Sequence, residues 1–199
     1  GFSYRIFLET ISDNYNQLIN NKKVVINHSI AQYYQFSDYH NYLVGSGKLD
    51  EKFEAFEERL TNIPKVYFPS DFPRTKKQTH NGHYLPIFLD ANKTREIRNF
   101  AVKSSSSIYQ TLLVIFGIII GRHLGIGDVI ITSPTSGRTS KQFDRTVGCF
   151  PNLIIQRLSI DYNTSFNDIM EENRGDIIST LNNQDLPFIE ILERCNLFD

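Results

Sequence analysis

The sequence predicts an α/β fold, and three apolar segments in its second half carry this prediction. Residues 112–120 are apolar but fall short of the roughly 20 residues that cross a membrane, so we expect a helix buried in a protein core. Residues 129–132 are all β-branched and lie between Gly127 and Pro134, which is typical of a strand covered on both faces. Residues 153–155 have the same character. Together these segments predict a mixed sheet with helices packed around it.

The composition is that of a globular chain without a strong charge bias. The 199 residues carry a formal net charge of −1, so neither nucleic acid nor a membrane is expected as a partner. The two cysteines, Cys149 and Cys195, form no disulfide framework, which favours a reducing compartment, and we expect a cytoplasmic protein. Because the chain does not begin with Met, we also expect it to be a piece of a longer protein.

The first third of the chain predicts three helices. Apolar residues at helical spacing predict one over residues 2–15, with Phe2, Ile6, Phe7, Ile11 and Tyr15 on one face. The polar residues 20–23 end it as a loop. Ser29 is expected to cap a second helix that ends at residues 45–47, and a charged third helix is expected over residues 49–60.

Residues 64–81 are the least regular part of the chain. Pro69 and Pro73 lie close together and enforce an extended backbone, so this segment is the expected boundary between two lobes. The predicted division is residues 1–63, a crossing segment over 64–82, and a second lobe over 83–199.

The second lobe continues with alternating and helical patterns. Residues 83–90 alternate loosely and predict a strand, and residues 93–104 predict an amphipathic helix. A polar loop over residues 139–146, expected to be mobile, separates the two inner strands. Ser107 and Ser165 are expected to cap helices, and Pro187 is expected to start the last one.

The residues alone show no catalytic set. None of the five histidines forms the His-Glu-x-x-His pattern of zinc proteases, and neither a nucleophile elbow nor a phosphate loop occurs. His80 and His83 flank Gly82, where a metal pair is possible but a solvated loop is the stronger interpretation. Cys149, beside Gly148, is interpreted as a packing residue.

Arg138 stands out because it follows Gly137 just after a predicted buried strand. A guanidinium cannot lose its charge, so a buried one needs a carboxylate or several carbonyl partners. We expect Arg138 to be buried or half-buried with such a partner.

Short motifs in order along almost the whole chain resemble the condensation domain of nonribosomal peptide synthetases. Gly1-Phe-Ser resembles the end of the family's His-His-x-x-x-Asp-Gly-Trp-Ser signature. The segment with Asp38 resembles Tyr-x-Asp-Tyr-Ala-x-Trp, although Phe36 replaces the first Tyr and Tyr42 the Trp. The segment Phe-Pro-Ser-Asp-Phe-Pro-Arg, with Asp71 at its centre, resembles the family's Leu-Pro-x-Asp-x-Pro-Arg crossing between lobes.

Two further motifs lie in the second lobe. Gly-Cys-Phe-Pro-Asn resembles Gly-x-Phe-Val-Asn, with Pro151 as a departure, and Gln-Asp-Leu-Pro-Phe matches Gln-Asp-x-Pro-Phe at every fixed position. The family-motif positions of this chain are Asp38, Asp71, Gly148, Asn152, Gln184, Asp185 and Pro187.

The resemblance implies a two-lobed fold like that of chloramphenicol acetyltransferase, of which this chain would form mostly the second lobe. It also implies an acyltransferase of secondary metabolism. Two carrier proteins send phosphopantetheine arms into a tunnel between the lobes, and the acceptor amine attacks the donor thioester to form an amide. The expected partners are peptidyl or aminoacyl carrier proteins and the rest of the parent synthetase. No cofactor is expected to bind the chain directly.

The resemblance further implies that the signature histidines and aspartate precede Gly1, so no catalytic residue is expected in this chain, which would be inactive alone. Arg138 is the candidate structural partner of that aspartate, and Gly1 marks the end of the signature. A piece with unpaired strand edges and open apolar surface is expected to self-associate or to be held by the rest of its protein.

Other interpretations stay open at this point. The chain could belong to a related acyltransferase or epimerase of the same fold, although the Gln-Asp-x-Pro-Phe match favours condensation over epimerisation. It could also be a noncatalytic module that docks a carrier protein.

Overall fold

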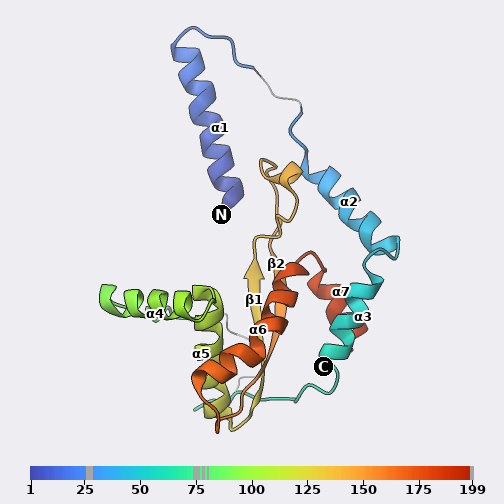
Figure 1. Ribbon diagram of the computed structural model, residues 1–199. Helices are drawn as coiled ribbons and strands as arrows, with labels where there is room; N and C mark the ends of the chain where they lie inside the picture. The colour runs from blue at the N-terminus through green and yellow to red at the C-terminus, as the bar shows by residue number, and fades with distance from the viewer. Residues whose placement is uncertain (26–28, 74–76, 78, 80, 198–199) are drawn as a thin grey trace. The chain divides into compact units, whose positions relative to one another are not determined.

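The computed structural model describes residues 1–25, 29–73, 77, 79 and 81–197. Within this part of the chain there are seven α-helices, a short 3-10 helix and two strands (Figure 1). The α/β class predicted from the sequence is confirmed. Strands β1 (Asp128–Thr135) and β2 (Asn152–Ser159) form a two-stranded sheet. The strands are antiparallel, because Asp128 contacts Arg157 at one end and Thr135 contacts Asn152 at the other.

The chain divides into two compact units. The first contains Gly1–Thr61, Thr132–Ile154 and Leu181–Asp199, and the second contains Asn62–Ile131 and Ile155–Thr180. Both units take residues from either side of the predicted crossing segment at 64–82, and the predicted division of the chain into lobes stays a prediction.

Helices α1 (Phe2–Ile19), α2 (Tyr33–Gly45) and α3 (Asp50–Arg59) confirm the three helices predicted at the start of the chain. The predicted cap of α2 is wrong, since Gln32 rather than Ser29 occupies the N-cap position. The main-chain N–H of Gln32 donates to Oε1 of Gln35 at 2.7 Å, so this pair closes the first turn.

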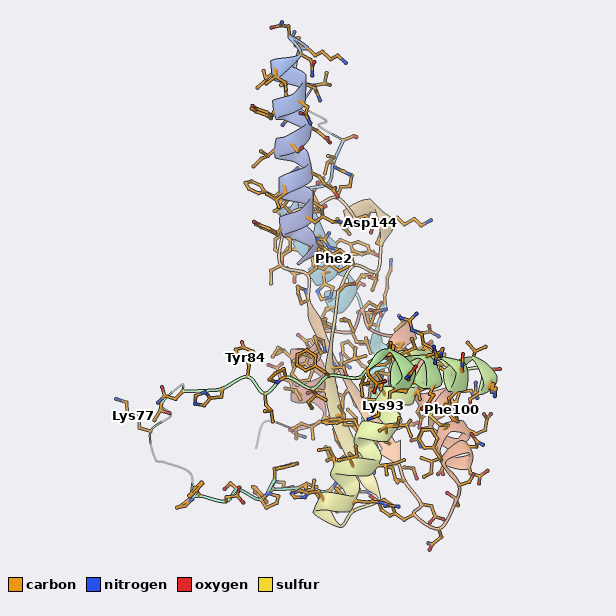
Figure 2. The ribbon with its side chains drawn as sticks, turned by 90° about the vertical axis from the view of Figure 1, so that its left-hand side faces the viewer. Phe2, Lys77, Tyr84, Lys93, Phe100 and Asp144 are labelled. Carbon is orange, nitrogen blue, oxygen red and sulfur yellow. The ribbon has the colours of Figure 1, made fainter. Side chains whose placement is uncertain are left out.

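Helix α1 presents most of its apolar side chains to solvent. Of its residues only Ile6 is buried, whereas Phe7, Ile11 and Tyr15 are 50–62% exposed. Each helical residue turns by about 100°, so these three lie on a different side of the helix from Ile6. Figure 2 shows the side chains standing out along α1. The prediction that these three residues share one face with Ile6 is therefore wrong.

Helix α3 packs against α7 (Phe188–Arg194) in the first unit (Figure 1). The guanidinium of Arg194 stacks over the buried ring of Phe53 at 4.1 Å and forms an ion pair with Asp50 at 3.1 Å. Because both charged groups are partly exposed, stacking and burial of Phe53 hold the helices together more than the ion pair does.

The second unit contains α4 (Ala91–Lys103), α5 (Ile108–Leu124) and most of α6 (Phe166–Asn182). Ser107 caps α5 as predicted, because its hydroxyl accepts from the N–H of Gln110 at 3.1 Å while the Gln110 side chain accepts from Ser107 N–H at 2.7 Å. Ser165 caps α6 in the same reciprocal way with Asp168.

Helix α5 approaches β2 closely at a glycine. A Cβ atom on Gly117 would lie 2.5 Å from the side chain of Leu158, so only glycine permits this distance. In the described ranges no helix by itself is long and apolar enough to cross a membrane; α4 and α5 meet that length and composition only as a pair bent by 105°.

The strand predicted over residues 83–90 is wrong. These residues belong to no helix or strand, and Tyr84, labelled in Figure 2, is fully exposed at 102%. Leu85, Ile87 and Phe88 are exposed as well. The alternating pattern is that of a strand, but a strand also needs a neighbour for its N–H and C=O groups, and no described segment pairs with this one.

Candidate active site around Arg138

A turn at Gly137 orients Arg138 toward the loop that follows β1. Gly137 has a φ of +63°, which favours glycine, and a Cβ there would lie 1.7 Å from the carbonyl oxygen of Phe150. The chain can therefore turn against Phe150 only at a glycine, and the turn brings Arg138 over the Phe150 ring at 4.0 Å from its centre.

The guanidinium of Arg138 is held by carbonyl oxygens. Its Nη2 donates to the carbonyl of Thr146 at 2.8 Å, and its Nη1 donates to the carbonyl of Phe143. No carboxylate in the described part of the chain forms an ion pair with it. The sequence left open whether a carboxylate or several carbonyls would be the partner of a half-buried Arg138, and the structure shows carbonyls. Burial lowers the pKa of Arg138 and the charge of Asp144 partly opposes this, but arginine stays charged.

Ser3 joins α1 to the same site. Its hydroxyl accepts from Nη2 of Arg138 and from the N–H of Gly148, both at 3.1 Å, and donates to the Gly148 carbonyl at 2.7 Å. Ser3 was assigned no role of its own from the sequence, although its place in the Gly1-Phe-Ser motif was a signal that could have found it.

Gly148 is closely confined on its other side by Tyr33. A Cβ atom on Gly148 would lie 2.1 Å from the Tyr33 ring, and the Tyr33 hydroxyl donates to the carbonyl of Cys149 at 2.6 Å. The first and fourth family motifs, with Gly1-Phe-Ser in one and Gly148 in the other, thus meet at Arg138.

Aromatic rings form the wall behind Arg138. The ring of Phe36 lies 4.5 Å from that of Phe150, 5.2 Å from that of Phe143 and 5.5 Å from that of His40, measured between centres. Phe143 is buried in the short 3-10 turn η1 (Lys141–Phe143). The loop expected to be mobile is therefore anchored at a buried ring and at two carbonyls bound to Arg138.

Asn152 connects the fourth motif to the fifth. Its Nδ2 donates to the carbonyls of Gln184 at 3.0 Å and Leu186 at 2.6 Å, and its Oδ1 accepts from the N–H of Phe188 at 3.2 Å. Pro187 occupies the N-cap position of α7 and has no side chain that could cap the helix. Asn152 supplies that cap from the start of β2.

Asp185 ties the fifth motif to α2 and α3. Its carboxylate forms an ion pair with Lys52 at 3.0 Å, and its carbonyl oxygen lies 3.3 Å from Nε2 of His40. Lys52 comes from α3 and His40 from α2, so Asp185 fixes the motif against both helices.

Some predicted positions lie outside this arrangement. Asp38 is exposed on α2, and Asp71 is exposed in the second unit. The arginine that ends the Asp71 motif, Arg74, and the predicted metal candidate His80 lie outside the described residues. No group of three or more histidine, cysteine or acidic side chains in the described ranges could hold a metal ion.

An open groove of about 480 Å³ runs beside Arg138. The residues that line it include Gly1, Ser3, Arg138 and residues 147–151. The interpretation of Cys149 as a packing residue is wrong, because Cys149 precedes β2, is exposed and lines this groove. The structure therefore places Gly1 and Arg138, the two predicted structural residues of the active site, in one groove.

Solved structures define the class of fold. The chain superposes on the X-domain from teicoplanin biosynthesis with a TM-score of 0.87 at 14% identity, covering 100% of this chain and 45% of that one. It superposes on the first condensation domain of the calcium-dependent antibiotic synthetase with a TM-score of 0.74 at 16% identity, covering 98% and 42%. The fold is that of condensation domains, which resemble chloramphenicol acetyltransferase, as predicted.

The sequence then defines the family. A model of the condensation domain matches residues 1–198, so the chain belongs to the condensation-domain family. It is 29% identical over 163 residues to phosphinothricin tripeptide synthetase PhsC of Streptomyces viridochromogenes, covering 81% of this chain and 15% of that protein. It is 25% identical over 167 residues to bacitracin synthase 2 of Bacillus licheniformis, covering 83% and 6%. The chain thus spans a small part of these synthetases and under half of the solved domains.

Proposed function

We propose that this chain supplies the arginine-bearing side of a condensation site, in a synthetase that joins a carrier-bound acyl donor to a carrier-bound amine. One observation carries the proposal: the Ser3 hydroxyl binds both Arg138 and Gly148, so family motifs that are 145 residues apart meet in one groove. A protein core alone does not require this meeting of polar motif residues at an open groove.

The proposed reaction is an acyl transfer. The acceptor amine attacks the carbonyl carbon of the donor thioester, a C–N bond forms, the C–S bond breaks, and the thiol stays on the donor's carrier arm. A base must accept a proton from the amine. Residues 1–199 contain no adjacent pair of histidines, so we place this base outside them.

Arg138 has a structural role in this proposal. Its three protein bonds fix a cation at the groove, where the signature aspartate of the family would be its carboxylate partner. The fixed guanidinium would hold that signature, and with it the histidine, in place.

Carrier proteins are the proposed partners, together with the rest of the parent synthetase in the cytoplasm. The phosphopantetheine arms belong to the carriers and act as substrates, not as cofactors of this chain. A groove of about 480 Å³ is within the usual size of a small-molecule site.

A docking role without chemistry is the second candidate, and one observation favours it. The TM-score of 0.86 to the X-domain in its complex with OxyB is higher than the 0.74 to the calcium-dependent antibiotic condensation domain. That X-domain forms a complex with another protein, OxyB. By this analogy, the surface of the present chain would bind a protein partner.

The test uses the parent synthetase with donor and acceptor carriers loaded from a panel of amino acids. Intact mass spectrometry should detect a peptidyl acceptor carrier, and Arg138→Ala should abolish it. Arg145→Ala is the matched control, because Arg145 lies nearby in the chain but is exposed, and among the described residues its one ion pair is a 3.9 Å contact to Glu9. Carrier binding without amide formation for every pair would overturn the catalytic proposal and favour docking.

A further inference from the structure

The Ser3 hydroxyl uses its full capacity for hydrogen bonding. A hydroxyl has one donor and two acceptor lone pairs. Ser3 donates to the carbonyl of Gly148 and accepts from Gly148 N–H and Arg138 Nη2. A hydroxyl placed here by chance would seldom fill its donor position and both acceptor positions with partners that lie 135 and 145 residues away in the sequence.

Two of the five N–H groups of Arg138 stay available. Bonds to Phe143, Thr146 and Ser3 use three, and no described residue accepts from the other two. Arg138 also lines two open grooves of the first unit, of about 480 and 540 Å³. The direction in which the free N–H groups point is therefore set by the three bonds that hold the guanidinium.

Ser3 differs from the other two partners of Arg138. Phe143 and Thr146 follow Arg138 in the same loop and move with it, whereas Ser3 lies in the first turn of α1. Ser3 alone among these three partners relates the guanidinium to another element.

We propose that Ser3 is a positioning residue that locks Arg138 and the Gly148 peptide in one geometry at the start of α1. Its importance for amide formation rests on the proposed function, but the geometric claim does not. Removing the hydroxyl should loosen the guanidinium and the Gly148 N–H together. Restoring a hydroxyl on a different side chain should restore both.

The experiment compares Ser3→Ala, Ser3→Thr and wild type in the full chain. Phenylglyoxal modification of Arg138 is followed by peptide mass spectrometry, and exchange of the Gly148 N–H is followed by NMR. We expect Ser3→Ala to speed Arg138 modification about tenfold, the loss expected for one hydrogen bond to a charged group. We expect faster Gly148 exchange too, and Ser3→Thr should return both rates to near wild type.

Two controls separate positioning from general loosening. Thr10→Ala removes a hydroxyl of the same helix that, among the described residues, bonds only to the carbonyl of Ile6, at 2.8 Å, so this variant should behave as wild type. Arg157, paired with Asp128 in the second unit, is the internal reference for global unfolding.

An unchanged Arg138 rate in Ser3→Ala overturns the proposal, as does an equal rise at Arg157 or failure of Ser3→Thr to rescue. None of these readouts uses amide formation, so a failure of the proposed function would be seen separately.

Discussion

Replacing Asn152 should destabilise the chain more than its partial exposure suggests. Asn152→Ala removes three hydrogen bonds, to the carbonyls of Gln184 and Leu186 and from the N–H of Phe188. At about 1 kcal/mol net for each, the expected loss in free energy of unfolding is about 3 kcal/mol. Part of this loss is the cap of α7, which Pro187 cannot replace.

Urea unfolding followed by circular dichroism measures this change. Asn92→Ala is the control, because Asn92 is exposed and makes one side-chain bond, to Arg95. A surface change of this kind should cost less than about 0.5 kcal/mol. If Asn152→Ala were no more destabilising than Asn92→Ala, the assignment of Asn152 as the link between the two motifs would be refuted.

Asn152→Asp gives a sharper version of the same test. It keeps the shape but places a carboxylate oxygen against two carbonyl oxygens that lie 3.0 and 2.6 Å from Nδ2 in the wild type. Repulsion should raise the pKa of the new carboxyl in the folded state above its unfolded value. The destabilisation should therefore be full at neutral pH and shrink as the pH falls and the carboxyl becomes protonated. A destabilisation independent of pH would contradict this geometry.

Three further predictions follow from the same structure. Gly148→Ala should lower the melting temperature, because its Cβ would lie 2.1 Å from the Tyr33 ring and overpacking typically costs about 1–3 kcal/mol. Gly175→Ala in α6, where no atom lies within 4 Å of the new Cβ, should raise it; the opposite order would refute the packing argument. Hydrogen bonds from the hydroxyl and the main-chain N–H of Ser165 hold the pKa of Asp168 below its ordinary 3.8. Ser165→Ala removes the hydroxyl and keeps the N–H, so an NMR titration should find the pKa of Asp168 higher in the variant than in wild type. Because that pKa is depressed by folding, the part of the stability difference that comes from the bond between the Ser165 hydroxyl and the Asp168 carboxylate should be present above about pH 4 and be lost at lower pH. The part that comes from the hydroxyl accepting from the Asp168 N–H should stay, so a stability difference that does not shrink in acid would contradict this prediction. Sedimentation should find the chain self-associating through exposed residues such as Phe7, Ile11, Tyr84 and Phe88, and a compact monomer would contradict this.

Local signals predicted the elements that depend only on neighbouring residues. Ser107 and Ser165 cap their helices because each needs only a partner three residues further on. The apolar runs that form α5, β1 and β2 were found for a similar reason. A buried segment needs apolar side chains of its own, whichever segment of the chain it packs against. Arg138 could be singled out because its permanent charge demands partners.

The failures concern features that depend on distant residues. Residues 83–90 have the alternation of a strand, but the neighbour that would make them one is not in the described chain. The exposure of α1 could not be predicted, because periodicity says which side chains share a face and not what covers it. The partners of Arg138 were left open for the same reason, and Ser3 was missed because its place in the Gly1-Phe-Ser motif marks the residue but not its contact with Arg138, 135 residues away.

The way Arg138 is held has a consequence for enzymology. Its partners are a hydroxyl, two carbonyls and an aromatic ring, and none of these gains or loses a proton between acid and alkaline extremes. Arg138 and these partners should keep the same protonation throughout an assay buffer series. Asp144 is the nearby acid whose charge influences the pKa of Arg138. Any bell-shaped rate profile recorded for the parent synthetase would then report other ionising groups, which simplifies the search for the base.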